Sequence, residues 1–224
     1  MSRTRKTANR ISRSNKLKDR LYREIQTPIE LISESVGHFN HCLREGRYFY
    51  TDIKKEGILL FHSNRFVLDE SIELSIKAQR KKAEQYFTHW FESAEDFFEG
   101  YEFFLKKNKN KIAAFQLHQA TERFYSAFLL VLTDYKPKIH DIDKLGKLAA
   151  AQESKLLEVF PKGTNDERQR FELLQKAYIN ARYTENFNIT REDLEWLAER
   201  VSKLQKLTEK ICKEKIESIR ESQS

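Results

Sequence analysis

The sequence predicts a mainly α-helical fold: an antiparallel bundle of four to five helices, preceded by a small N-terminal segment of mixed α and β character. Only six Gly and three Pro occur among the 224 residues, so most of the chain lacks the residues that interrupt helices. Apolar residues recur at three- and four-residue steps over most of the chain after residue 80, which is the period of an amphipathic helix. Sixteen Phe and nine Tyr give the expected core an aromatic character.

The first segment, residues 1–23, is a basic tail. It holds nine Lys or Arg and a single acid, Asp19, a charge of +8, while the remaining 201 residues sum to −1. A charge-rich segment with few apolar residues is typical of a disordered or solvated tail. Contact with a nucleic-acid backbone is the alternative interpretation.

Residues 24–65 are predicted to form a small α/β segment. Pro28–Ile32 is a short β-prone run, and His38–Arg44 is long enough for a helical turn, which Gly46 closes. The stretch Tyr48–Phe61 has the pattern of a helix that a glycine stops, followed by a β-like run. This mixture is too short to form a core by itself.

After a connector at 66–80, residues 81–217 are predicted to form the helical bundle, and residues 218–224 a short tail. Apolar side chains of a first helix line one face from Phe87 to Leu105. A break rich in Lys and Asn ends that helix, and the second helix is apolar on more than one side. The second helix is therefore expected to be central or to lie in a subunit interface, which predicts a homodimer.

Three further helices are indicated by their N-terminal capping residues. Asp141 precedes a short apolar helix and can accept hydrogen bonds from its first amides. Thr164 and Glu167 have capping-box spacing. Thr190 and Asp193 resemble another such start, although Asp replaces the usual Glu or Gln. Short connections between these helices complete the antiparallel bundle.

Three motifs follow one another on consecutive helical elements: Leu117–Tyr125, Lys138–Asp141 and Ala177–Tyr183. In that order they resemble the HEPN family (higher eukaryotes and prokaryotes nucleotide-binding) over roughly residues 80–215. The resemblance implies a four- or five-helix bundle that commonly dimerises, with its functional groove near the dimer seam. It also implies a link to nucleotidyltransferases, because many members lie beside, or are fused to, a minimal nucleotidyltransferase.

The segment Thr27–Leu60 resembles the closing part of such a nucleotidyltransferase domain. The catalytic part is missing, since no Gly-Ser dipeptide occurs that could form the phosphate-binding turn. Asp141-Ile142-Asp143 has the spacing of a metal-binding acid pair, but a helix start explains it better. The chain is therefore either a shortened relative or part of a longer parent.

Phosphate binding is predicted at four residues: Arg182, Lys138, His140 and Lys136. Ribonuclease members of the HEPN family carry an Arg followed after four to six residues by a His, where His moves a proton and Arg steadies the phosphate. Arg182 is in the position of that Arg, but residues 183–190 hold no His, so no catalytic residue is predicted. The alternatives to phosphate binding are an ion pair between Arg182 and Glu185, and a solvated loop at 136–140.

A polar cluster is predicted on the second helix, where His118, Glu122 and Tyr125 fall on one face. A metal pair is possible at this spacing, but a satisfied cluster at a helix or subunit interface is the favoured interpretation, because no other ligand is apparent. The two cysteines, Cys42 and Cys212, also lack metal-like spacing. The sequence predicts no metal, no cofactor and no membrane span, and a reducing cytoplasm is the expected location.

Three functions are compatible with these observations. The favoured one is a non-catalytic protein that binds nucleotide or RNA phosphate, as a homodimer. In the second, the chain is the partner of a separate nucleotidyltransferase, as in paired toxin–antitoxin systems. In the third, it is a HEPN ribonuclease in which His140 or His118 replaces the missing acid/base.

Overall fold

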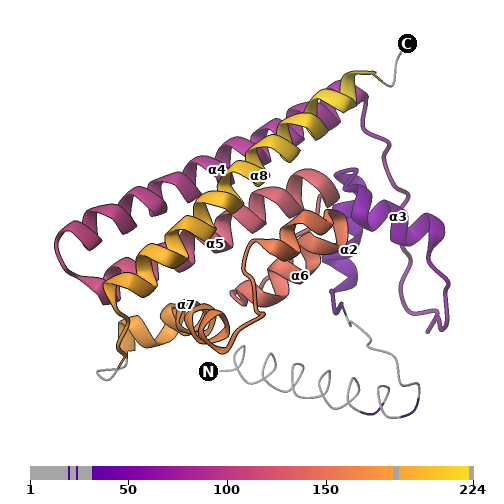
Figure 1. The fold of residues 1–224 in the computed structure, drawn as a ribbon. Helices are drawn as coiled ribbons and strands as arrows, with labels where there is room; N and C mark the ends of the chain where they lie inside the picture. The colour runs from indigo at the N-terminus through magenta and orange to yellow at the C-terminus, as the bar shows by residue number, and fades with distance from the viewer. Residues whose placement is uncertain (1–19, 21–23, 25–31, 184–186, 222–224) are drawn as a thin grey trace.

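The computed structural model describes residues 20, 24, 32–183 and 187–221. Over these ranges the chain is mainly α-helical, as predicted, and contains no β-strand. The elements, in chain order, are α2 (Val36–Arg44), α3 (Tyr48–Glu56), α4 (Ile76–Lys106), α5 (Asn110–Thr133), α6 (Ile142–Gln152), the 3-10 turn η1 (Ser154–Glu158), α7 (Asn165–Tyr183) and α8 (Arg191–Glu221). Figure 1 shows α4, α5 and α8 running alongside one another, with α6 and α7 packed against α5.

The core is built around α5, the second of the predicted bundle helices. Fifteen of its 24 residues are buried, and α4, α6, α7 and α8 all pack against it. The predicted central position of this helix is therefore confirmed. The predicted break before it is also confirmed, since α4 ends at Lys106 and α5 begins at Asn110. No helix in the described part of the chain combines the length and apolarity that a bilayer span requires.

The capping residues identified in the sequence begin the later helices. Asp141 accepts hydrogen bonds from the amides of two residues in the first turn of α6, each at 3.1 Å. The Thr164 and Glu167 side chains exchange hydrogen bonds with each other's amides at the start of α7. Thr190 and Asp193 do the same before α8. Asp therefore serves in place of Glu in the second capping box.

The expected β character of the N-terminal segment is not found in the described residues. Helices α2 and α3 form as predicted, and α3 ends before Gly57. Residues Ile58–Phe61, however, do not belong to a strand. A strand needs a neighbouring strand to pair with, and the described ranges offer none. Of the other expected β run, Pro28–Leu31 lies outside the described residues, and Ile32 is not in a strand.

Helices α2 and α3 pack at one end of the bundle, against the end of α5 (Figure 1). The Tyr48 hydroxyl donates to the carbonyls of Val131 and Leu132, the last turn of α5, at 3.2 Å each. The ring of Phe49 stacks on Tyr135, with 4.1 Å between centroids. Aromatic packing and partly buried hydrogen bonds therefore join α3 to the end of α5 and the loop after it.

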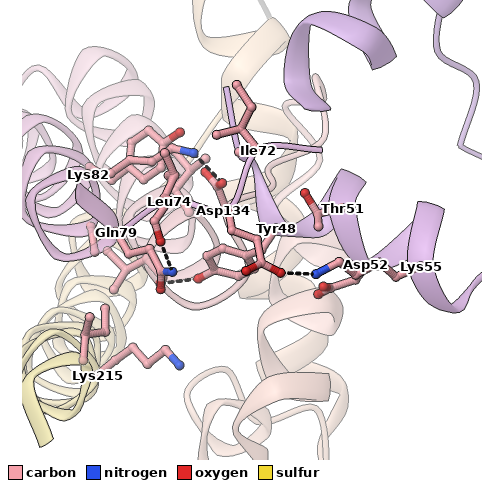
Figure 2. A pocket seen from close by; sticks show the side chains of 17 residues that line it. Tyr48, Thr51, Asp52, Lys55, Ile72, Leu74, Gln79, Lys82, Asp134 and Lys215 are labelled. Atoms are coloured by element: carbon pink, nitrogen blue, oxygen red, sulfur yellow. Dashed lines mark hydrogen bonds and ion pairs between the residues drawn. The ribbon is translucent and has the colours of Figure 1, made fainter. Parts of the chain in front are cut away.

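A cavity beside the contact between α3 and the end of α5 contains a buried ion pair. Lys82 Nζ of α4 lies 2.6 Å from Oδ2 of Asp134, whose side chain is only 2% exposed (Figure 2). Asp134 ends α5 in the left-handed conformation, at φ 52°, and its amide donates to Leu130. One residue therefore ends the central helix and fixes its end to α4.

Candidate functional site

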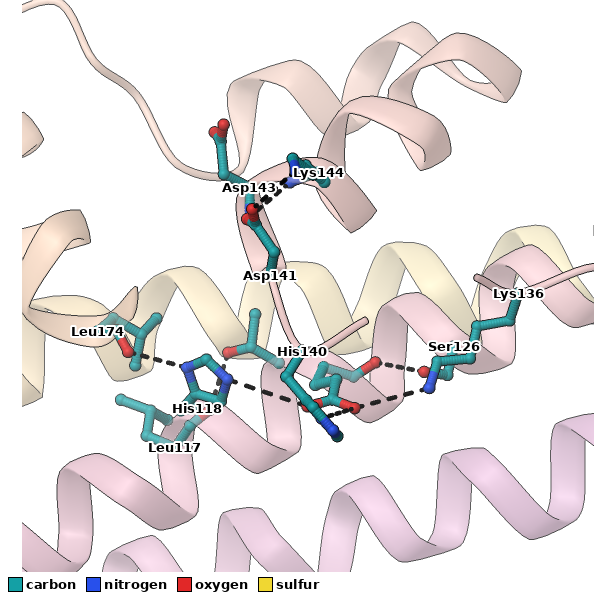
Figure 3. Close-up of polar contacts among 11 residues, drawn as sticks. Leu117, His118, Ser126, Lys136, His140, Asp141, Asp143, Lys144 and Leu174 are labelled. Carbon is teal, nitrogen blue, oxygen red and sulfur yellow. Dashed lines mark hydrogen bonds and ion pairs between the residues drawn. The ribbon is translucent and has the colours of Figure 1, made fainter. Parts of the chain in front are cut away.

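Glu122, on α5, is the centre of the candidate site. The residue is 5% exposed, and its two carboxylate oxygens lie 3.0 and 3.1 Å from His140 Nδ1. Lys136 Nζ lies 3.6 Å from Oε1 of the same carboxylate. Both partners come from the loop between α5 and α6 (Figure 3). The buried carboxylate therefore holds this loop against the bundle.

His140 presents one ring nitrogen to the Glu122 carboxylate and the rest of its ring to the surface. Since a carboxylate oxygen accepts, Nδ1 is the nitrogen that donates. The imidazole stacks on the ring of Tyr178 from α7, with 4.5 Å between centroids and 15° between planes. The His140 side chain is 55% exposed, and both residues line an open cleft along α7. Nε2 of His140 is therefore the nitrogen left to meet a ligand.

His118 lies deeper, one turn before Glu122 on α5. Its Nδ1 donates to the carbonyl of Leu174 on α7, at 2.9 Å. Burial lowers the pKa of His118, and the neighbouring Leu174 carbonyl and Glu122 carboxylate oppose that shift. A buried, neutral imidazole that is bonded to a backbone carbonyl joins two helices. We therefore assign His118 a structural contact between α5 and α7.

The lowered pKa of His118 predicts a loss of stability in mild acid. Below the ordinary histidine pKa of about 6.5, the unfolded chain takes up a proton at His118 that the folded chain excludes. The free energy of unfolding should therefore fall as the pH is lowered from about 7.5 to about 5.5, and His118→Asn should flatten this slope. Urea unfolding of both proteins at the two pH values measures the effect. Glu122 and His140 are unchanged in the variant, so a difference between the two slopes comes from His118. Identical slopes would contradict the assignment.

A strip of alternating cations and aromatic rings continues from the cluster along α4 and α5. Lys136 Nζ lies 4.9 Å from the centre of the Trp90 ring, and the Arg123 guanidinium lies 5.3 Å from the same ring. Arg123 also lies 4.9 Å from the ring of Phe97. These four residues are partly buried. The strip extends the site from the loop onto the α4–α5 face.

The other residues predicted for the site are Lys138, Tyr125 and Arg182. Lys138 is exposed, on the same loop. Tyr125 is buried and packs against α6, where its hydroxyl would lie 3.0 Å from a Cβ at Gly146. Arg182 follows Tyr178 by four residues in α7, a step that places two residues on one helical face. The Arg182 side chain lies outside the described residues.

Sequence reasoning missed three residues of this surface: Trp90, Arg123 and Tyr178. Trp90 belongs to the apolar face from Phe87 to Leu105, a pattern that predicts a core position. Tyr178 belongs to a motif that indicates the HEPN resemblance but no role for this ring. Arg123 carried a usable signal, because a cation next to Glu122 on an otherwise apolar helix needs partners of its own. Those partners are two aromatic rings.

The two acids of Asp141-Ile142-Asp143 do not converge on one point. Asp141 caps α6, while Asp143 pairs with Lys147 at 2.7 Å and with Lys162. The capping interpretation of this motif is confirmed. Within the described ranges, no group of three or more His, Cys, Asp or Glu is placed to hold a metal ion. The chemistry that this surface offers is hydrogen bonding, positive charge and ring stacking.

No curated protein matches this sequence. The family model of the HEPN domain matches residues 87–211, which is more than half of the chain. The matched range includes all of α5, α6 and α7, and with them the cluster around Glu122 and the stacked pair of His140 and Tyr178. The chain therefore belongs to the HEPN family.

Proposed function

We propose that this protein binds nucleotide or RNA phosphate, without turnover, on the surface around His140 and Tyr178. The observation that carries the proposal is the stacked, half-exposed His140 ring at the edge of the cleft along α7. A flat exposed ring system accepts a nucleobase, and base stacking on such rings contributes about 1–3 kcal/mol per base. The HEPN family membership of the chain is consistent with a nucleotide ligand.

In this proposal, the positive charge for the phosphate comes from the loop that holds His140 and the helix that holds Tyr178. Glu122 compensates Lys136, so Lys136 alone adds little net attraction for an anion. Lys138 is exposed on the same loop, and Arg182 follows Tyr178 by one helical turn. In this proposal Lys138 and Arg182 bind the phosphate, His140 Nε2 donates a hydrogen bond when it is protonated, and Tyr178 supports the base.

Calorimetry with adenosine 5′-monophosphate tests this site on the full chain. Arg182→Ala and Tyr178→Leu should each weaken binding by about 1.5–3 kcal/mol, the scale of a hydrogen bond to a charged group or of one stacked base. Arg80→Ala is the matched control, because Arg80 pairs with Glu84 on α4, away from the cleft. An unchanged circular dichroism spectrum shows that the variants fold. Absence of binding at millimolar nucleotide, or equal effects of all three variants, would eliminate the site.

A second candidate function, metal-independent ribonuclease activity, is favoured by the Glu122–His140 pair. A carboxylate that holds Nδ1–H fixes the tautomer in which Nε2 can take a proton. His118 does not suit this role, because it is buried and its Nδ1 is bonded to a carbonyl. Cleavage of labelled single-stranded RNA in EDTA, abolished by His140→Asn and retained in Lys155→Ala, would favour this function over binding alone.

Partnership with a separate nucleotidyltransferase is the third candidate function. In this proposal residues 24–65 retain the closing part of a nucleotidyltransferase domain, and the chain assembles as a homodimer. The observation that supports a separate partner, rather than the homodimer, is the exposed apolar run Ile58–Phe61, which pairs with no strand among the described residues. Light scattering at micromolar concentration tests whether the chain is a homodimer. Copurification tests whether it binds a separate nucleotidyltransferase.

A further inference from the structure

The segment that follows α3 exposes more apolar surface than any other part of the described chain. Its outgoing arm, Ile58–Phe61, has exposed fractions of 87%, 73%, 91% and 83% in order. Its return arm, Phe66–Leu68, adds Phe66 at 57% and Val67 at 81%. Figure 1 shows both arms extending from α3 away from the bundle. With Leu68 at 39%, seven large apolar side chains therefore face water on two neighbouring arms.

The return arm is held firmly to α2 and α3 at its base. Asn40 of α2 donates to the Val67 carbonyl at 3.0 Å and accepts from the Asp69 amide at 3.1 Å. Lys54 of α3 donates to the Asp69 carbonyl at 2.7 Å. Further on, Ile72 donates to the carbonyl of Leu43 at 3.1 Å. The fold therefore fixes the direction in which the arms leave the protein.

The backbone of the outgoing arm is unpaired. Among the described residues, none of the amides of Ile58–Phe61 donates a backbone hydrogen bond. When such a segment is buried, its N–H and C=O groups need partners, and the edge of a β-sheet supplies them in register. A helical surface or a lipid layer does not. A strand with a free edge is therefore the occupant that satisfies the backbone of this arm along its whole length.

The order of side chains along the arm gives a second constraint. In an extended chain Ile58 and Leu60 point to one face, and Leu59 and Phe61 to the other. An unbroken apolar run of this kind is typical of a strand that is covered on both faces, as in α/β sheets with helices on each side. A partner that contacts only one face of the arm would leave the two apolar side chains on the other face in water.

The exposed apolar side chains of this segment lie together on two neighbouring arms. Single exposed apolar residues are ordinary on a protein surface, whereas several that lie together mark an interaction site. A second copy of the chain fits less well as the occupant. Two copies could pair only these arms with one another, and such a two-stranded ribbon would leave apolar side chains in water.

We propose that Ile58–Phe61 adds as a strand to the open edge of a β-sheet in a partner protein whose sheet is covered on both faces. The return arm then packs its Phe66 and Val67 against the same partner. This interaction surface lies at the α2–α3 end of the chain and uses no residue of the proposed phosphate site. Failure of the phosphate site therefore leaves this proposal standing, whereas the third candidate function rests on the same Ile58–Phe61 run.

Photo-crosslinking in the cells that normally express the chain tests the proposal. The probe is p-benzoylphenylalanine in place of Leu60, with the same probe in place of Leu157 on η1, a 65% exposed residue, as the matched control. The expected result is a crosslink from position 60 alone, which peptide mass spectrometry places on an edge strand of a partner's sheet. Crosslinks to a second copy, to residues 24–32 of the same chain or to a helical segment would overturn the proposal, as would no crosslink.

Paired substitutions then test whether both faces of the arm are covered. Ile58→Lys with Leu60→Lys charges one face, and Leu59→Lys with Phe61→Lys charges the other. Each pair should weaken binding of the identified partner at least about ten-fold, because each removes two buried apolar side chains. Leu157→Lys should leave that binding unchanged. An effect from only one of the pairs would show a one-sided contact and would exclude a sheet that is covered on both faces.

Discussion

Asp134→Ala is expected to lower the free energy of unfolding by about 3–5 kcal/mol, the cost of removing one partner from a buried ion pair. The substitution leaves Lys82 without its carboxylate in a site where the lysine side chain is 19% exposed. It also places Ala at a left-handed residue, which adds about 1 kcal/mol of backbone strain. Both effects act at the end of the central helix, so the whole bundle should lose stability.

Urea unfolding, followed by circular dichroism, measures this loss. Asp134→Asn should cost less than Asp134→Ala, because Asn tolerates the left-handed conformation. Glu172→Ala is the control for an exposed pair: Glu172 contacts Lys176 on the surface of α7, and its removal should cost less than about 1 kcal/mol. In a double-mutant cycle with Lys82→Ala, the losses should not add, since the two residues share one interaction. Additive losses would contradict the ion pair.

Glu122→Ala is expected to cost about 3 kcal/mol or more, because Lys136 would remain largely buried without its carboxylate. His140 would lose the acceptor of its Nδ1 hydrogen bond in the same change. Glu122→Gln keeps an acceptor for His140 while removing the negative charge, so it should be less damaging. It should also strengthen binding of adenosine 5′-monophosphate, since Lys136 and His140 would no longer face a carboxylate.

Urea unfolding and calorimetry with the same nucleotide provide the two measurements for Glu122. A loss below about 1 kcal/mol for Glu122→Ala would show that Lys136 reaches water when released, as long cationic side chains can. Tighter nucleotide binding by Glu122→Gln would support the binding function. Weaker binding would show that the carboxylate itself positions His140 for the ligand. The two results therefore separate the stabilising role of Glu122 from its effect on binding of the anionic nucleotide.

Most of the helical architecture was predictable because its determinants are local in sequence. The apolar stripe from Phe87 to Leu105 defines α4, and the capping residues at Asp141, Thr164 and Thr190 mark later helix starts. Such patterns depend on neighbours three or four residues away. They can therefore be recognised in the sequence without knowledge of the tertiary fold.

The candidate site was only partly predictable, because its contacts join distant residues. Glu122 and His140 are 18 positions apart, and their contact depends on the path of the loop after α5. Nothing in the motif containing Tyr178 indicated that its ring lies against His140. The Ile58–Phe61 run shows the opposite case, where a strong local β preference is not expressed because no neighbouring strand is present among the described residues.

The central position of α5 also constrains how relatives of this chain can diverge. With 15 of 24 residues buried and four other helices around it, α5 has little solvent-facing surface on which neutral substitutions can accumulate. A change of volume on α5 must be matched by a compensating change on whichever neighbour it touches. Substitutions in α5 should therefore be inherited together with substitutions in α4, α7 or α8, while the outer faces of those helices drift independently.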